Sequence, residues 1–361
     1  MSTTPRSDPP SDRSAEAGGA ELTASPAVDE TAPRAGARAT GRVKSFLLRP
    51  DLALPLITLA LFLYLTFANE FFFSERNLLN ITSAMALVGI AAAFATIVLI
   101  SGGIDLSPVV TFIMAGLVCQ WALARGIPVP ITILLGVAAG GLIGLFNGLL
   151  IAIGNLNPFI VTLGTNFLFT GLAFVVTDGE ALVIDNEGFK NIGTQDLIGD
   201  VSTSTIVMAA AFAVAFCILR FTRFGVHVFA VGGDTNAARL SGVPVIRVKT
   251  LVYVIAGLAA GVAGVLLAAS SGSVAPFQSA GQNDLLVIIA AVIIGGTALE
   301  GGRGTVIGTL VGILLLGIIA NGLVLEDISS FWQPVVVGAL LLIAIILDEV
   351  RRRAALKVVS R

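Results

Sequence analysis

Charged residues are scarce in this sequence. Asp, Glu, Lys and Arg make up 12% of the 361 residues, and hydrophobic residues make up 56%. A soluble globular domain carries about 25% charged residues. The apolar residues also fall in runs close to the ~20 residues that a helix needs to cross the hydrocarbon core of a bilayer. The composition therefore excludes an ordinary soluble domain and predicts a membrane protein.

Patterns typical of enzymes and metal sites are missing as well. The single histidine, His227, lies in a basic stretch with no second His or Cys close by, so we expect an exposed loop residue and no metal site. Cys119 and Cys217 fall in separate apolar runs, which favours small packing residues over a disulfide. No glycine-rich phosphate loop ends in Lys-Ser or Lys-Thr, so the chain itself is not expected to hydrolyse nucleotide. We expect no catalytic residue, no cofactor bound by this chain and no nucleic-acid partner.

The dominant feature of the sequence is a series of ten apolar runs between polar breaks. In lipid the backbone must satisfy its own hydrogen bonds, which favours helices over an open sheet, and the alternating pattern of a membrane barrel is absent. The sequence predicts an all-α, polytopic membrane helix bundle with about ten transmembrane helices in contact with lipid. The expected spans are residues 52–69, 79–100, 108–124, 128–153, 158–177, 204–221, 250–271, 285–299, 305–325 and 331–347.

The placement of positive charge predicts the orientation. With a cytoplasmic N-terminus, the outer connections hold only Arg76, Arg125 and Lys190 of the 21 Lys and Arg residues, as the positive-inside rule requires. An even number of spans then places both termini in the cytoplasm. The same frame puts six acidic residues of the largest loop outside: Asp178, Glu180, Asp185, Glu187, Asp196 and Asp200.

Two regions differ in composition. Residues 1–42 are rich in Ala, Ser, Thr and Pro and have too few large apolar residues to form a core, which predicts a disordered cytoplasmic arm. Residues 43–361 form the expected membrane domain. Within that domain, a basic cytoplasmic loop covers about residues 222–249.

One acidic residue, Asp105, stands between two apolar runs in the motif GGIDLS. Gly102 and Gly103 let the backbone bend or approach a neighbour there, and Asp105 or Ser107 can cap the helix that follows. The alternative is a functional acid inside the membrane. The residues alone leave both interpretations open.

The span that begins at Pro158 carries the densest group of uncharged polar residues. Thr162, Asn166 and Thr170 recur every four residues and share one helix face, with Thr165 and Phe169 beside it and Asn157 just before the helix. Hydroxyl and amide groups suit a neutral, hydroxyl-rich solute. The same residues also join helices with no ligand present, so a pathway and a structural role are both open.

The basic loop contains the segment DTNAARLSG, residues 234–242. Asp234 or Thr235 can cap about two helical turns before Gly242 and Pro244 end them. A short cytoplasmic helix of this kind suits docking into a groove of a partner protein, and its charge alone also explains it as a topology anchor.

Glycine spacing and one internal echo complete the pattern. Gly136, Gly140, Gly144 and Gly148 recur every four residues, which predicts close helix packing. The stretch ISGGIDLS at 100–107 is similar to IIGGTALE at 293–300, each between two apolar runs, and indicates an internal repeat.

Four ordered blocks carry a family resemblance: GGIDLS, NPFIVTLGT, AVGGDTNAARLSGVPVIRVK and AAVIIGGTALEGGRGTVIGTLVG, followed by NGL at 321–323. In these blocks the chain resembles the permease subunit of bacterial ABC importers of the ribose, xylose and galactose type. The resemblance covers nearly everything from residue 52 to the end. Two departures are Pro108-Val109 after GGIDLS, where the family has Val-Gly, and residues 285–287, where the family has an acid, Leu and a second acid.

The resemblance implies a multi-pass permease of the bacterial plasma (inner) membrane that translocates a neutral monosaccharide or similar polyol. It implies a second permease copy, identical or related, an extracytoplasmic sugar-binding protein, and separate ATPase subunits that bind ATP and Mg. It also implies that Asp234, Asn236, Ala237, Ala238, Arg239 and Gly242 couple the permease to the ATPase, that the helix from Pro158 to Thr170 lines the path, and that Gly102, Gly103 and Asp105 belong to a structural or gating element. An ion-coupled carrier or facilitator is the alternative, although the spans offer almost no titratable group for proton coupling.

Overall fold

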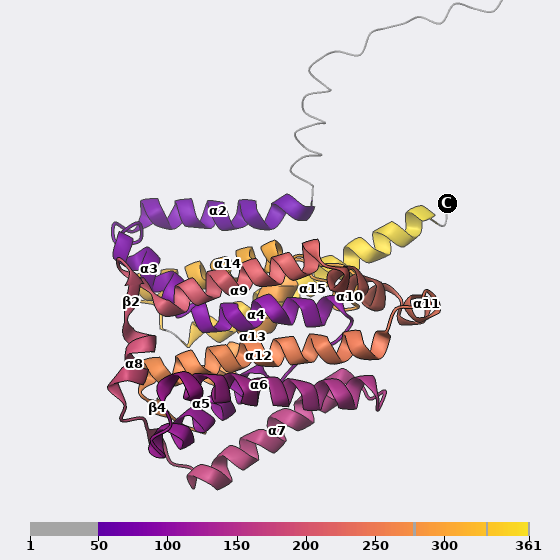
Figure 1. The fold of residues 1–361 in the computed structure, drawn as a ribbon. Coiled ribbons are helices and arrows are strands. Elements are labelled where there is room, and N and C mark those ends of the chain that lie inside the picture. Colours follow the sequence, from indigo (N-terminus) through magenta and orange to yellow (C-terminus); the bar gives the residue numbers. More distant parts are fainter. Residues whose placement is uncertain (1–49, 277–278, 330, 360–361) are drawn as a thin grey trace, which may run out of the picture. The chain divides into compact units, whose positions relative to one another are not determined.

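The computed structural model describes residues 50–276, 279–329 and 331–359, in which the chain is almost entirely helical (Figure 1). This confirms the all-helical prediction, and the predicted arm at residues 1–42 lies outside the described residues. The helices in chain order are α2 (Pro50–Ala68), α3 (Glu75–Ala84), α4 (Ala86–Ile100), α5 (Pro108–Ala124), α6 (Val129–Ala152), α7 (Pro158–Thr177), α8 (Glu187–Thr194), α9 (Thr203–Phe221), α10 (Arg223–Gly233), α11 (Thr235–Leu240), α12 (Val245–Ser271), α13 (Ser279–Ile294), α14 (Val306–Leu325) and α15 (Trp332–Val359). The short strands are β1 (Leu182–Val183), β2 (Asp196–Ile198), β3 (Val201–Ser202) and β4 (Ser273–Val274).

Five of the described helices, α6, α7, α9, α12 and α14, are long and apolar enough to cross a membrane. The pair α3 and α4 counts as a sixth, but it bends by 50° around Met85, a break that the sequence did not predict. Shorter apolar helices occupy the other four expected ranges: Leu54–Ala68, Pro108–Ala124, Asp284–Ile294 and Trp332–Ile346. Each of the ten ranges expected from the sequence therefore contains an apolar helix.

The backbones of α6 and α12 touch directly through glycines. A Cβ atom on Gly140 would lie 2.7 Å from the Cα of Gly261, and one on Gly257 would lie 2.9 Å from the Cα of Gly144. Such close approach is what a stripe of glycines at intervals of four permits. Two-thirds of the apolar window of α12 (67%) is buried, against 17% for α7. The helix α12 therefore lies in the interior of the bundle, and α7 lies at its edge.

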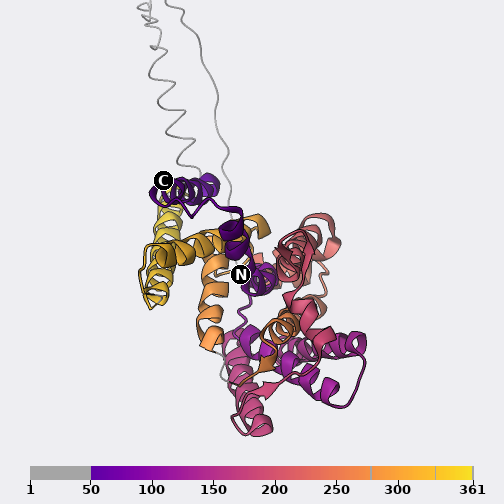
Figure 2. The same cartoon turned by 90° about the vertical axis from the view of Figure 1, so that its left-hand side faces the viewer.

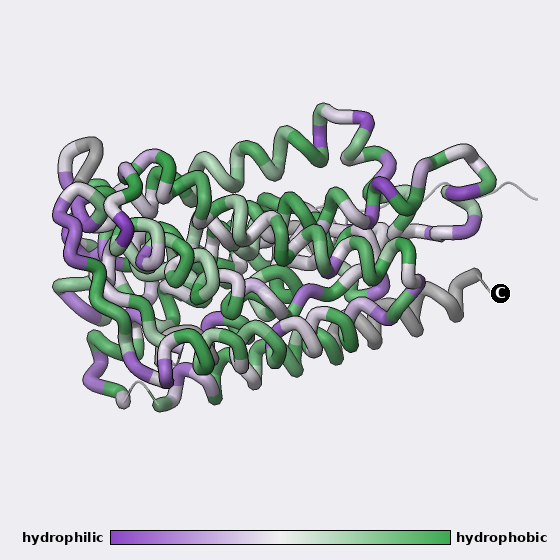
Figure 3. Tube along the Cα trace, turned by 60° about the horizontal axis from the view of Figure 1, so that its bottom comes forward, coloured by the Kyte–Doolittle hydropathy of each residue, from purple (hydrophilic) through white to green (hydrophobic). Residues whose placement is uncertain are grey.

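Hydrophilic residues gather at the two ends of the helices, with a largely hydrophobic middle (Figure 3). The helix α8 lies at one end, and α10 and α11 lie at the other (Figure 1). Figure 2 faces the end that carries α8, with several helices close to end-on. There β1 pairs antiparallel with β4, with Leu182 opposite Val274. The acidic connection after α7 and the basic segment around α11 thus lie at opposite ends, as the charge pattern predicts.

Two side chains differ in exposure from what the sequence predicts. His227 is half-buried within α10, because Val228 and Val231 bury one face of that segment and make it a helix. Cys119 is buried as expected, but Cys217 is exposed on α9, so the packing interpretation is wrong for that residue. Both cysteines are free.

Candidate functional site

The chain leaves helical structure between α4 and α5, and this break contains Gly102, Gly103 and Asp105. We call residues 101–107 the unwound segment. Gly102 has a φ of 77°, in the left-handed region that favours glycine. A Cβ atom on Gly103 would collide with the hydroxyl of Tyr253 on α12. The path of the backbone therefore requires both glycines.

Asp105 closes a turn in front of α5. Its Oδ1 accepts hydrogen bonds from the Ser107 backbone N–H at 2.8 Å and from the Ser107 hydroxyl at 2.6 Å. Ser107 occupies the N-cap position of α5, but its side chain makes no capping bond. The predicted capping role is therefore wrong for both residues, because Asp105 bonds to the residue at the cap and not to the free N–H groups inside the helix.

Side chains from two helices bind the carbonyl groups that the unwound segment exposes. The Asn166 amide on α7 donates to the Leu106 carbonyl at 2.6 Å. The Thr162 hydroxyl on α7 and the Tyr253 hydroxyl on α12 approach the Ile104 carbonyl at 3.4 Å and 3.2 Å. Non-helical backbone inside a membrane protein requires such partners, because no bulk water is available there. The polar face of α7 therefore holds the unwound segment in place.

A second set of polar contacts links α5, α6 and α7. The Asn147 amide on α6 donates to the Ser107 hydroxyl at 2.9 Å, and the Thr165 hydroxyl donates to Asn147 Oδ1 at 2.6 Å. All three side chains are buried. Asn147 was not predicted as a site residue, although an Asn inside the glycine stripe of an apolar span is a visible signal in the sequence.

The six predicted pathway residues do not all lie together. Thr162, Thr165 and Asn166 belong to the network just described, and the Thr170 hydroxyl joins it through Asn166 Oδ1 at 3.3 Å. Phe169 instead packs edge-to-face on Phe146 of α6, with ring centroids 6.3 Å apart. Asn157 is exposed and caps α7 by accepting from the Phe159 N–H.

This network offers hydrogen bonds and a single charged group. Among the described side chains that form hydrogen bonds with the unwound segment, Asp105 is the one carboxylate and the others are hydroxyls and amides. Thr162 and Thr165 are buried and already bonded, whereas Asn166 and Thr170 are half-buried. The arrangement can present hydrogen-bond donors and acceptors to a neutral hydroxylated molecule.

At the end of the bundle that carries α10 and α11, Asp234 caps α11 as predicted. Its Oδ1 accepts from the N–H groups of Asn236 and Ala237 at 2.8 and 2.9 Å. Asn236, Ala237 and Arg239 are exposed, whereas Ala238 is 5% exposed and packs against the chain itself. Gly242 ends the turn with a φ of 82°. Leu240, which was not among the predicted coupling residues, is 90% exposed.

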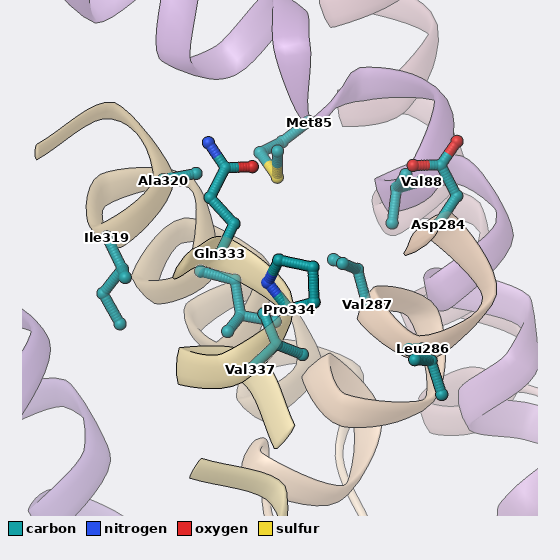
Figure 4. A pocket seen from close by; sticks show the side chains of 11 residues that line it. Met85, Val88, Asp284, Leu286, Val287, Ile319, Ala320, Gln333, Pro334 and Val337 are labelled. Atoms are coloured by element: carbon teal, nitrogen blue, oxygen red, sulfur yellow. The ribbon is translucent and has the colours of Figure 1, made fainter. Parts of the chain in front are cut away.

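A cavity of about 100 Å³ lies between α4, α13, α14 and α15 (Figure 4). Its walls are mostly apolar, and Asp284 and Gln333 are its polar side chains. In Figure 4 they lie at separate points of the rim, with Met85 between them. Asp284 directly precedes residues 285–287, where the sequence departs from the family pattern.

Comparisons with known proteins consistently give permease components of transport systems. Residues 77–345 match a family described as branched-chain amino acid transport system / permease component. The ribose import permease protein of Bacillus subtilis (strain 168) is 38% identical over 78% of this chain and 87% of its own length. The L-arabinose ABC transporter permease protein of Azospirillum brasilense is 36% identical over 90% and 95%. A probable ABC transporter permease protein of Escherichia coli (strain K12) is 39% identical over 84% and 91%. No solved structure matches this chain.

Proposed function

Because the chain belongs to the family of branched-chain amino acid transport system permease components, we propose that it is the membrane permease subunit of an ATP-driven ABC importer for a neutral monosaccharide or similar polyol. The protein is a multi-pass protein of the bacterial inner membrane. It is a transport subunit and not an enzyme. Relatives whose names specify ribose or L-arabinose support a sugar as the substrate class.

The observation that carries this proposal is α11. A helix capped by Asp234, with an exposed Arg239 and Leu240, projects at the basic end of the bundle. The sequence has no phosphate loop of its own. The chain therefore receives its energy from separate ATPase subunits on the cytoplasmic side, and these bind ATP and Mg. In this proposal Asp234, Asn236, Ala237, Arg239 and Gly242 form the coupling element, and Ala238 holds α11 on the permease.

The proposed topology has ten spans with both termini in the cytoplasm. Five long apolar helices, the bent pair α3 and α4, and four shorter apolar helices support that number. The positive-inside rule supports the orientation, because Arg223, Arg239 and Arg247 lie around α11, at the end opposite α8.

The sugar path in this proposal follows the polar face of α7 and the unwound segment. Asn166 and Thr170 are half-buried and offer an amide and a hydroxyl. A neutral sugar needs hydrogen bonds and no counter-charge. A zwitterionic amino acid would require paired charges, and Asp105 is the one charged side chain described in this region. Gly102, Gly103 and Asp105 shape the segment that opens and closes the path.

The partners follow from the family. Besides the ATPase subunits, an extracytoplasmic sugar-binding protein delivers the solute to the end that carries α8. A second permease, identical or related, completes the path within the lipid bilayer. The chain itself binds no cofactor in this proposal.

The test is transport by the purified complex. The chain is co-expressed with its genomic neighbours and reconstituted in liposomes with ATP inside, and uptake of D-ribose and L-arabinose is measured. We expect a stable complex with an ATPase, uptake that stops when the ATPase is inactivated, and uptake that persists when ion gradients are collapsed. Uptake by the permease alone, independent of ATP, would establish the ion-coupled carrier or facilitator instead.

A separate substitution tests whether α11 couples the permease to the ATPase. Arg239→Glu reverses the exposed charge on α11, and Arg223→Glu reverses one in α10 as the matched control. We expect Arg239→Glu to abolish ATP-driven uptake while membrane insertion is unchanged. Normal uptake by this variant would refute the role of α11.

A further inference from the structure

Three backbone segments meet beside α11 with no side chain between them. The Gly302 N–H, in the loop between α13 and α14, donates a 2.8 Å hydrogen bond to the Ile100 carbonyl at the end of α4. A Cβ atom on Gly232, near the end of α10, would overlap that carbonyl oxygen and lie 2.7 Å from the Gly302 nitrogen. One on Gly301 would lie 2.8 Å from the Cα of Gly102. We call this contact the glycine junction; it consists of Ile100, Gly102, Gly232, Gly301 and Gly302.

The junction joins the two copies of the internal echo. The first copy, residues 100–107, begins at Ile100, whose carbonyl is the acceptor in the junction. The second copy, residues 293–300, ends directly before Gly301. Each copy follows an apolar helix, α4 or α13, and leads into another, α5 or α14. The first copy and the loop that follows the second copy are therefore connected at this point through main-chain atoms.

The junction also lies between the two functional regions proposed above. On one side, Gly232 is two residues from Asp234, the cap of α11. On the other side, Gly102 is two residues from Ile104 and four from Leu106, whose carbonyls contact Thr162 and Asn166 of α7. A short stretch of main chain thus separates α11 from the polar face of α7.

A contact made only of main-chain atoms has no rotamers that could absorb a displacement. Close-packed protein interiors also have low compressibility and transmit strain. We therefore expect a movement of the end of α10 against the junction to displace the end of α4 and the loop before α14.

We propose that the glycine junction transmits the movement of α11 to the unwound segment, which makes Gly232 and Gly301 positioning residues for transport. The inference rests on the proposed function, because it requires α11 to be driven by an ATPase. It adds the route by which that movement reaches the sugar path.

The chain offers two matched pairs of variants for the test. Gly232→Ala places a methyl group in the junction, whereas Gly233→Ala, the next residue of α10, would meet nothing within 4 Å. Gly301→Ala and Gly296→Ala both add a side chain at a φ near +90°, at 87° and 88°. Only the residue at 301 would meet other atoms. The control in each pair thus shares the local backbone cost and lacks the collision.

The complete complex carrying each variant is reconstituted in liposomes with ATP inside and the sugar-binding protein outside. The readout is the number of D-ribose or L-arabinose molecules taken up per ATP hydrolysed. We expect Gly232→Ala and Gly301→Ala to lower this ratio about tenfold, within the 5- to 150-fold range typical of allosteric coupling, while ATP hydrolysis continues. We expect both control variants to keep the ratio of the unmodified complex.

Equal ratios in all four variants would overturn the inference. Loss of the assembled complex in both junction variants, with intact control complexes, would also overturn it, because the contact would then serve folding alone. A failure of the proposed function has a different signature, since the unmodified complex itself would then show no ATP-dependent uptake.

Discussion

The side-chain amide of Asn166 donates a 2.6 Å hydrogen bond to the backbone carbonyl of Leu106, 60 residues away in the sequence. This bond attaches α7, which lies at the edge of the bundle, to the unwound segment. The uncharged polar face of α7 is thereby fixed against the segment that contains Asp105. Removal of the Asn166 amide would leave the Leu106 carbonyl with no other described side-chain donor.

Asn166→Ala is therefore expected to impair transport. An unsatisfied buried acceptor costs about 1–3 kcal/mol, and the free carbonyl leaves the segment without its fixed position. We expect uptake by the reconstituted complex to fall about tenfold or more while the yield of complex changes little. Thr177→Val is the control, because the Thr177 hydroxyl bonds only to Ala173 and Gly179 at the end of α7. A loss of assembly with normal uptake per complex would assign Asn166 to helix joining alone.

Two substitutions of Asp105 distinguish the role of its negative charge from the role of its hydrogen bonds to Ser107. The Asn side-chain oxygen in Asp105→Asn can still accept from the Ser107 N–H and hydroxyl, whereas Asp105→Ala leaves both without this acceptor. We expect Asp105→Asn to retain sugar uptake. We expect Asp105→Ala to lower the thermal stability of the purified permease, at a cost of about 1–3 kcal/mol. Loss of uptake in Asp105→Asn at full stability would show that the negative charge itself is required.

The exposed Leu240 on α11 predicts a contact with the ATPase. Full burial of a leucine side chain stabilises an interface by about 1.5–3 kcal/mol, so Leu240→Ser should weaken the binding of the ATPase subunit roughly tenfold or more. The stability of the isolated permease should not change, because the residue is 90% exposed. Val183→Ser is the control, because Val183 is 70% exposed in β1, which pairs with β4 at the opposite end of the bundle. Binding measured with immobilised permease would contradict the prediction if both variants behave alike.

The contact between α6 and α12 predicts a steric effect on stability. Gly140→Ala adds a methyl group that would overlap the Gly257 carbonyl, and overpacking of this kind costs about 1–3 kcal/mol. Gly164→Ala on α7 meets nothing within 4 Å and should be neutral or stabilising by up to about 1 kcal/mol. Thermal unfolding of the purified permease in detergent measures both. Equal melting temperatures for the Gly140→Ala and Gly164→Ala variants would show that α6 and α12 can move apart without a loss of stability.

The part of the site that was predictable from the sequence is the part that local chemistry defines. The spacing of Thr162, Asn166 and Thr170 placed them on one helix face, and the carboxylate of Asp234 followed by a short polar segment predicted the cap of α11. Asn147 was missed because its partners, Ser107 and Thr165, lie 40 and 18 residues away. Phe169 shares the helix with the polar stripe but contacts α6, which no spacing within α7 could indicate.

Composition and periodicity alone determined that this chain forms apolar helices with opposite charge at their two ends, because the bilayer imposes length and hydrophobicity on every segment that crosses it. Only the tertiary structure decided that the helical chain breaks at Met85, that the unwound segment is held by α7 and α12, and that Ile100, Gly232 and Gly302 touch. These contacts join residues separated by as many as 202 positions in the sequence. Their formation depends on how helices pack, and one-dimensional patterns of hydrophobicity do not encode which backbones come within hydrogen-bonding distance.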